Sequence, residues 1–230
     1  MRKFAISDIH GCRKTFLALL DKIALSKSDV LYLLGDYVDR GPDSKGVFDE
    51  IFHLQKNGYE VHCLRGNHEE ILLRSLYDRM GLDNWLLTDG KKTMDSFGVE
   101  VTEDIPTIYL DFIREMEYYF EVDDYILVHA GLNFNLFEPL EDQRDLLVIR
   151  RWYDTVRYDW LGSRVILHGH TPMPYFDIEE QLVNLDKNRY LDIDAGCVYA
   201  GSDRPDRVGL GYLCAFDMTN RALFFQENVE

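Results

Sequence analysis

The chain has 230 residues, 46% of them hydrophobic, and its 25 basic and 41 acidic residues give a formal net charge of −16. A field of this sign repels polyanions, so the composition excludes a general nucleic-acid-binding protein, and any phosphate chemistry must be local. The length and apolar content predict a single domain over 1–230 with a hydrophobic core of its own.

The lengths of the apolar runs and the spacing of the cysteines indicate where in the cell the protein is expected. The longest apolar runs, such as 30–34, are far shorter than the ~20 residues that span a bilayer, so no membrane partner is expected. The first residues become polar too soon to hold the apolar part of a signal peptide. Because the four cysteines are scattered and form no CxxC pair, we expect them to be buried and reduced in a cytoplasmic protein.

Strand and helix signals alternate in the first third of the chain. Short apolar runs at 3–7, 30–34 and 60–64 predict buried strands. Apolar residues at helical spacing predict helices near 16–23, 47–54 and 69–77, and Gly58 is placed to end the second of these. This alternation predicts βαβ units, a mainly parallel central sheet and an α/β fold.

The rest of the chain contains further strand signals. Strands are expected at 125–128, 164–167, 190–193, 212–216 and 222–226, with a turn near 218–220 joining the last two, which predicts a more antiparallel second half. The segment 72–124 lacks the alternation and carries amphipathic stretches. We therefore expect about 72–124 to be a helical insertion beside the functional site.

Polar residues follow the predicted strands directly, and five of the seven histidines are among them. The carboxyl ends of strands in an α/β sheet converge on one crevice, so these residues can meet although they are far apart in sequence. The set comprises Asp8, His10, Asp36, Asp39, Arg40, Asn67, His68, His129, His168 and His170.

This set has the chemistry of a metal site. Asp8 and His10, two positions apart in extended chain, can face one cation, although such a pair alone is more often a solvated turn. Asp36 and Asp39 follow a buried strand, where two carboxylates are costly unless cations neutralise them; an acidic loop with an internal salt bridge is the ordinary alternative. Carboxylate, amide and imidazole ligands without thiolate suit Mn²⁺, Fe or Zn²⁺ and disfavour a structural zinc site.

Five segments also resemble, in order, the signature blocks of the calcineurin-like metallophosphoesterases, in particular their phosphoprotein phosphatase branch. They are 8–11 (DIHG), 35–41 (GDYVDRG), 66–69 (GNHE), 129–131 (HAG) and 169–172 (GHTP), and the likeness covers 3 to about 200. Trp85 with 93–97, and 194–199, are further similar to the short bacterial and phage serine/threonine phosphatases. The resemblance implies a β-sandwich of mixed sheets flanked by helices, with the helical insertion.

The resemblance also implies a role for each matching residue. Two divalent ions, most simply Mn²⁺, would be held by two ligand sets that share Asp36 as a bridge. The first set is Asp8, His10 and Asp36, and the second is Asp36, Asn67, His129 and His170. Arg40, Arg150 and Asn67 would bind the phosphate, and His68 with Asp39 would form the general-acid pair.

Two positions depart from the family pattern. Val148 stands where a tryptophan is usual, two positions before the second phosphate-binding arginine, so Arg151 is an alternative to Arg150. Pro172 replaces the final metal histidine of the broader superfamily, as it does in the phosphatase branch. His168 has no counterpart, and we expect it to support the site rather than to bind metal.

The resemblance implies hydrolysis of phosphate monoesters by attack of a metal-bridging hydroxide, most simply on a phosphorylated protein or a small phosphoester. A preference for phosphoserine and phosphothreonine over phosphotyrosine stays open. The alternative enzyme is a symmetrical dinucleoside-tetraphosphate hydrolase. A catalytically silent metal-binding module is disfavoured, because a scaffold needs neither a proton donor at His68 nor a phosphate clamp at Arg40.

Overall fold

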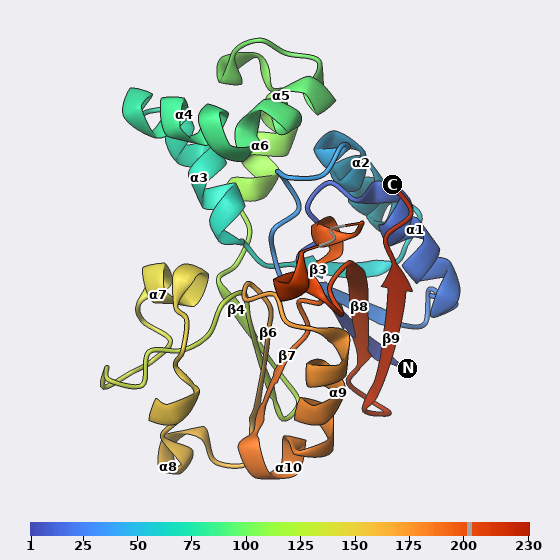
Figure 1. Ribbon diagram of the computed structural model, residues 1–230, viewed down its shortest axis with the longest axis vertical. Helices are drawn as coiled ribbons and strands as arrows, with labels where there is room; N and C mark the ends of the chain where they lie inside the picture. Colours follow the sequence, from blue (N-terminus) through green and yellow to red (C-terminus); the bar gives the residue numbers. More distant parts are fainter. Residues whose placement is uncertain (202–203) are drawn as a thin grey trace.

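Nine short strands in the described residues form two β-sheets flanked by helices (Figure 1). The computed structural model describes residues 1–201 and 204–230. The strands are β1 (Lys3–Ile6), β2 (Val30–Leu33), β3 (Glu60–Cys63), β4 (Tyr119–Val122), β5 (Tyr125–Val128), β6 (Val165–His168), β7 (Tyr190–Asp192), β8 (Tyr212–Asp217) and β9 (Ala222–Glu227). One sheet has the order β3-β2-β1-β8-β9 and the other the order β4-β5-β6-β7.

Both sheets are mixed, which confirms the expected α/β class and β-sandwich. Strands β1, β2 and β3 pair in parallel, and β8 joins β1 antiparallel. Strands β5, β6 and β7 also pair in parallel, so the expected antiparallel second half is wrong for these three strands and holds only for β4 and the β8–β9 hairpin. The single central sheet expected from the strand pattern is likewise wrong, because the parallel strands divide between two sheets.

The alternation of side chains along each strand produces the layers. In β1, Phe4 and Ile6 pack in the cluster that contains α1 and α2, whereas Ala5 faces the other sheet. In β5, Leu127 lies in the same cluster as Ala5, between the two sheets, and Ile126 packs on the opposite side of its sheet. Because successive side chains of a strand point to opposite faces, these two strands are buried on both sides and are apolar at every position except Lys3.

The helices lie on the outer faces and at one end of the sandwich (Figure 1). Some have clear sequence signals: Asp43 caps α2 by accepting a 2.9 Å hydrogen bond from the Gly46 amide, and Gly58, at φ +84°, follows its end. Their bounds are α1 (Arg13–Lys22), α2 (Ser44–Lys56), α3 (Asn67–Ser75), α4 (Arg79–Trp85), α5 (Lys91–Phe97), α6 (Thr107–Arg114), α7 (Gln143–Val148), α8 (Tyr158–Leu161), α9 (Tyr175–Val183) and α10 (Leu185–Asn188).

The segment expected to be a helical insertion, 72–124, contains the end of α3, then α4, α5 and α6, but its last strand belongs to a sheet. β4 pairs with β5 as an edge strand, so the last part of that segment belongs to the second sheet. No described helix combines the length and the apolar character that crossing a bilayer requires. All four cysteines are free and buried.

Candidate metal centre

The loops that follow the parallel strands of both sheets meet at one end of the sandwich. Main-chain hydrogen bonds join them within each sheet: the His10 amide donates to the Asp36 carbonyl at 2.8 Å, and the Gly169 amide donates to the His129 carbonyl at 2.8 Å. The Asp8 carboxylate connects the two sheets, because it accepts a 3.0 Å hydrogen bond from the His170 amide. The expected convergence of the strand-end residues is therefore present in the structure.

The backbone is left-handed at six of the predicted site residues. Such φ values are uncommon outside glycine and cost about 1–3 kcal/mol each, so they persist only where surrounding contacts enforce them. Here they turn consecutive polar side chains toward one point. The residues and their φ values are Asp8 (54°), His10 (45°), Asp36 (56°), Asp39 (70°), Arg40 (66°) and His170 (72°).

Two glycines of the motifs permit close approach at the same point. A Cβ at Gly66 would lie 2.2 Å from Asp36 Oδ1, and a Cβ at Gly169 would lie 2.2 Å from Asp8 Oδ2. Any side chain at either position would therefore displace a carboxylate of the centre.

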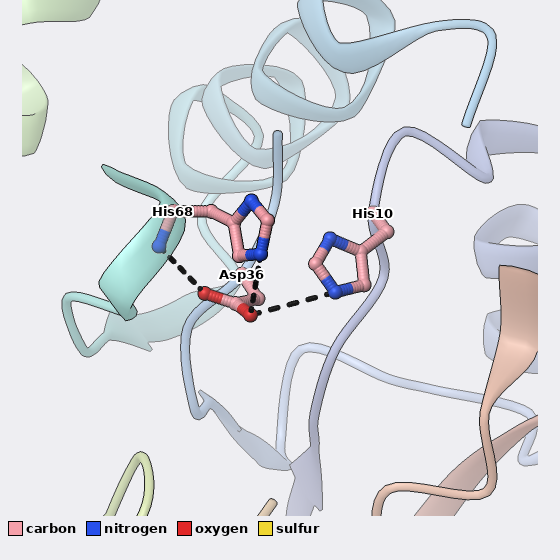
Figure 2. Close-up of side chains that lie close together, drawn as sticks. All are labelled: His10, Asp36 and His68. Carbon is pink, nitrogen blue, oxygen red and sulfur yellow. Dashed lines mark hydrogen bonds and ion pairs between the residues drawn. The ribbon is translucent and has the colours of Figure 1, made fainter. Parts of the chain in front are cut away.

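Asp36 lies at the middle of two donor groups. In the first, its Oδ2 is 3.4 Å from His10 Nε2 and 3.9 Å from His68 Nε2, and Figure 2 shows both rings directed at this carboxylate. In the second, the donor atoms of Asp36, His129 and His170 all lie within 4.8 Å of one another. Asn67 joins the second group, because its Oδ1 is 3.0 Å from His129 Nε2. One carboxylate shared by two groups is the arrangement predicted for a bridging ligand.

The first group differs from the predicted ligand set in one respect. The structure gathers the donor atoms of His68, His10 and Asp36 within 4.8 Å of one another. Asp8 is not part of that group, although its Oδ1 lies 3.9 Å from His10 Nε2. The other oxygen of Asp8 is engaged by Ser7 Oγ and the His170 amide. Geometry thus leaves His68 with two possible tasks, metal binding or proton donation.

The donor atoms suit divalent cations. His170 belongs to the second group, and its Nε2 is buried and has no hydrogen-bond partner in the described part of the chain. Burial lowers the pKa of His10 to about 3 and that of His170 to about 2, so both rings are neutral at physiological pH and keep a lone pair for a metal. A buried imidazole nitrogen left unpaired beside a carboxylate is explained most simply by a cation.

His68 is held by a buried carboxylate. Its Nδ1 is 2.7 Å from Asp39 Oδ2, and Asp39 also accepts from Trp85 Nε1 at 2.8 Å and from Thr93 Oγ1 at 2.6 Å. Burial opposes protonation of His68, but the Asp36 and Asp39 carboxylates outweigh it and raise its pKa to about 9. Sequence reasoning assigned no role to Trp85 or Thr93, and their separation from Asp39 in the chain gave no signal for this contact.

The two predicted phosphate-binding arginines border the centre. Arg40 Nη1 lies 3.0 Å from His10 Nε2, and its Nη2 lies 2.9 Å from His68 Nε2. Arg150 is exposed, and its Nη1 donates a 3.0 Å hydrogen bond to Thr171 Oγ1, directly after His170. The guanidinium of Arg150 therefore lies beside the residue that follows His170, and the choice of Arg150 or Arg151 as the second arginine stays a prediction.

Glu69 is a supporting residue to which the sequence assigned no role. It is fully buried, and its carboxylate accepts hydrogen bonds from the backbone amides of Asp36 and Tyr37, both at 2.8 Å, and of Val38 at 3.1 Å. Burial and the neighbouring Asp36 raise its pKa to about 7, while the amide donors favour the charged form. Glu69 thus fixes the loop that carries the shared carboxylate.

His168 is directed away from the donor groups. Its Nε2 is 3.1 Å from the Tyr153 hydroxyl, which in turn lies 3.5 Å from Asp192 Oδ2. Burial lowers the pKa of His168 to about 4, so it is a neutral member of this buried network. This position agrees with a supporting role behind the centre.

Comparisons with known proteins identify a family and two relatives of this chain. The family model described as "Calcineurin-like phosphoesterase" matches residues 1–201. A symmetrical bis(5'-nucleosyl)-tetraphosphatase of Nitrosomonas europaea is 33% identical over 137 residues, which cover 57% of this chain but only 45% of that protein. The asymmetrical bis(5'-nucleosyl)-tetraphosphatase PrpE of Oceanobacillus iheyensis is 26% identical over 217 residues, covering 84% of this chain and 83% of that one.

Solved structures share the fold. A candidate diadenosine tetraphosphatase superposes with a TM-score of 0.67 at 21% identity, covering all of this chain and 94% of the other. A serine/threonine phosphatase of Saccharomyces cerevisiae, similar to human PP5, gives 0.66 at 16% identity, with coverage of 100% and 81%. At these identities the likeness concerns the fold alone.

Proposed function

Since this chain belongs to the calcineurin-like phosphoesterase family, and is therefore a phosphoester hydrolase, we propose that its substrates are dinucleoside tetraphosphates. The sequence favoured a phosphoprotein substrate and kept the dinucleotide as the alternative. Both curated relatives described above are named tetraphosphatases, and one of them matches along most of its length, which supports the alternative. A resemblance to the short phage and bacterial protein phosphatases finds no comparable support.

The observation that carries the proposal is a basic cavity beside Arg40. It has a volume of about 480 Å³ and lies next to the candidate metal centre, with Tyr199 on its wall. Among the described residues that line it, four are basic and one is acidic: Arg40, Lys91, Lys92, Arg207 and Asp89. In a chain of net charge −16 such a group is unexpected, and it suits a substrate with several phosphates better than a single phosphate monoester.

The residues fit a pair of divalent cations. We propose that Asp8, His10 and Asp36 hold one ion, and that Asp36, Asn67, His129 and His170 hold the other. When bound, such ions polarise phosphoryl oxygens and lower the pKa of water. Mn²⁺ is the simplest choice for this mixture of oxygen and nitrogen ligands, and Fe and Zn²⁺ are compatible with it.

The protein side chains would orient the phosphate and supply a proton. Arg40 and Arg150 present planar donor pairs that match phosphate oxygens. Hydrolysis joins the water oxygen to phosphorus and breaks the bond to the leaving oxygen, and a proton given to that oxygen helps most when the leaving group is poor. His68 would give that proton from Nε2, while Asp39 holds the ring through Nδ1.

Product analysis tests the proposal. The Mn²⁺-loaded protein is incubated separately with diadenosine tetraphosphate and with a phosphoserine peptide, and the products are separated by ion-exchange chromatography. We expect cleavage of the dinucleotide, to two ADP if the cut is symmetrical or to ATP and AMP if it is not, with a kcat/KM at least a hundredfold above that for the peptide. A higher kcat/KM for the phosphoserine peptide than for the dinucleotide would instead establish a protein phosphatase.

A further inference from the structure

A second cavity lies between α3 and α7, on the side of the candidate metal centre marked by Asn67. Its volume is about 330 Å³, within the range of about 300–1,000 Å³ typical of small-molecule sites. Most of its wall is apolar, formed by Ile71, Tyr118, Leu147 and Val148, and Asn67 and Gln143 add two amides. In Figure 1 the two helices that border it face each other across one end of the sandwich.

Each of the two helices that border the cavity has a residue of the candidate metal centre, or one next to it, at or near one of its ends. Helix α3 begins at Asn67, which lines the cavity and whose Oδ1 is also 3.0 Å from His129 Nε2. Helix α7 ends at Val148, two residues before Arg150, which contacts Thr171. A phosphate ester bound at the centre would therefore have room for its organic part in this cavity.

The lining chemistry suits a planar heterocycle. The Tyr118 ring is held in place by Arg65, which donates a 2.9 Å hydrogen bond to its hydroxyl and lies 5.0 Å from the ring centroid. Ile71 and Val148 leave 37% and 41% of their surfaces exposed, so they offer apolar contact without rearrangement. The Gln143 amide can both donate to and accept from the edge of a base, and stacking on an aromatic side chain contributes about 1–3 kcal/mol per base.

The charges at the rim favour the same ligand. Arg74 and Arg144 line the cavity beside Glu70, and Glu70 is already paired with Arg65 at 3.1 Å and with Arg74 at 3.0 Å. Arg144 therefore adds positive charge next to apolar walls. A nucleotide combines a flat apolar ring with an attached anion, which is the complement of this surface.

We propose that this cavity binds the base and ribose of the nucleotide whose phosphate lies at the metal centre. The inference rests on the proposed function, which it deepens by assigning a place to one nucleoside. It makes this cavity the feature that distinguishes a nucleotide substrate from a simple phosphate ester.

Filling the cavity tests the inference. Val148→Trp places an indole between α3 and α7, and Val101→Trp is the control, because Val101 is 49% exposed and does not line the cavity. The readout is the ratio of kcat/KM for diadenosine tetraphosphate to kcat/KM for p-nitrophenyl phosphate. We expect this ratio to fall at least tenfold in Val148→Trp and to stay within twofold in Val101→Trp. An equal loss on both substrates, or no loss, overturns the inference.

A binding measurement separates this inference from the proposed function. Isothermal titration compares AMP with inorganic phosphate in the Mn²⁺-loaded protein. We expect AMP to bind at least tenfold more tightly than phosphate in the wild type and only about equally in Val148→Trp. Equal binding of both ligands by the wild type overturns the inference even if dinucleotides are hydrolysed, and tighter AMP binding upholds it even if they are not.

A second variant keeps the test decisive if Val148→Trp does not fold. Gln143→Ala removes the amide at the first position of α7 without filling the cavity. We expect it to weaken AMP binding three- to tenfold and to leave phosphate binding within twofold. Unchanged AMP affinity in a folded Gln143→Ala protein counts against recognition of the base edge.

Discussion

The indole Nε1 of Trp85 donates a 2.8 Å hydrogen bond to Asp39 Oδ2, the same oxygen that lies 2.7 Å from His68 Nδ1. A side chain from α4 thus shares a carboxylate oxygen with the proposed proton donor. The segment between β3 and β4 therefore does more than cover the site, since it orients a pair at its centre.

Replacing Trp85 with phenylalanine should misalign that pair without disturbing the cations. Removing one hydrogen bond to a charged acceptor costs about 1.5–3 kcal/mol, so we expect kcat to fall by about tenfold or more. Metal content by mass spectrometry should stay at the wild-type value. Loss of bound metal in step with kcat would show that Trp85 acts on the whole centre.

His68→Asn separates the two tasks that geometry leaves to this residue. If His68 donates a proton, turnover of esters with poor leaving groups should fall about 10²–10⁴-fold, while esters with good leaving groups lose far less. Phenyl phosphate and p-nitrophenyl phosphate provide that comparison. An equal loss on both, together with loss of metal, would make His68 a ligand in place of a proton donor.

Chelation should abolish activity and lower thermal stability together. The site buries the carboxylates of Asp8 and Asp36, and a ligand at a hundredfold its Kd stabilises the native state by about 2.7 kcal/mol. We expect Tm to drop after dialysis against EDTA and both properties to return when Mn²⁺ is added. His170→Ala, which removes the unpaired Nε2, should need more Mn²⁺ for half-maximal recovery. Activity that survives exhaustive chelation would contradict the metal centre.

The basic cavity beside Arg40 can be tested with two neighbouring arginines. Arg207 lines that cavity and stacks 4.3 Å from the Tyr199 ring centroid, whereas Arg204 pairs with Asp206 and does not line it. Arg207→Gln should raise KM for diadenosine tetraphosphate about three- to tenfold and should do so less at high salt. Arg204→Gln is the matched control. Identical KM values in the two variants would remove the support that this cavity gives to a polyphosphate substrate.

A partly buried ion pair far from the centre sets part of the pH dependence of stability. Asp29 is 3% exposed and accepts from Arg2 Nη2 at 2.7 Å, and this bond with those from Ser26 holds the pKa of Asp29 well below its usual value. Its contribution is therefore complete above the unfolded-state pKa of about 4 and is lost as the pH falls below it. Asp29→Asn should lower the free energy of unfolding by about 1–3 kcal/mol at pH 7.

Urea denaturation of the wild type and Asp29→Asn at pH 7, 4 and 2.5 checks this sign. The difference between them should shrink as the pH is lowered. Asp206→Asn, in a pair whose side chains are more than 60% exposed, should leave stability unchanged at every pH. A difference that grows in acid would mean that Asp29 is not the titrating group.

Much of the site could be predicted because its residues follow strands with strong signals. The run of β2 is apolar at every position and that of β1 at all but Lys3, and the polar motifs begin where each run ends. The division into two sheets could not be read from them, because a strand covered by a helix and a strand covered by another sheet have the same apolar pattern. β4 was missed because it is an edge strand whose exposed positions, such as Tyr119, interrupt the apolar signal.

Spacing along the chain also could not predict which donor side chains lie nearest to Asp36. His68 and Asp8 each lie close to His10 in space, and only the left-handed turns at Asp8, His10 and Asp36 decide which atoms face inward. Likewise, Trp85 contacts Asp39 across 46 residues of sequence, a pairing that follows from how α4 packs and not from any local pattern.

Those six left-handed residues have an evolutionary consequence. Glycine would occupy each of these backbone positions with less steric cost, so its substitution there would relieve strain while deleting a donor side chain. In a lineage released from selection for activity, such a substitution would raise thermodynamic stability while removing the chemistry. An inactive descendant of this chain should be recognisable by glycines at positions 8, 10 or 36 and by a higher melting temperature than its metal-free parent.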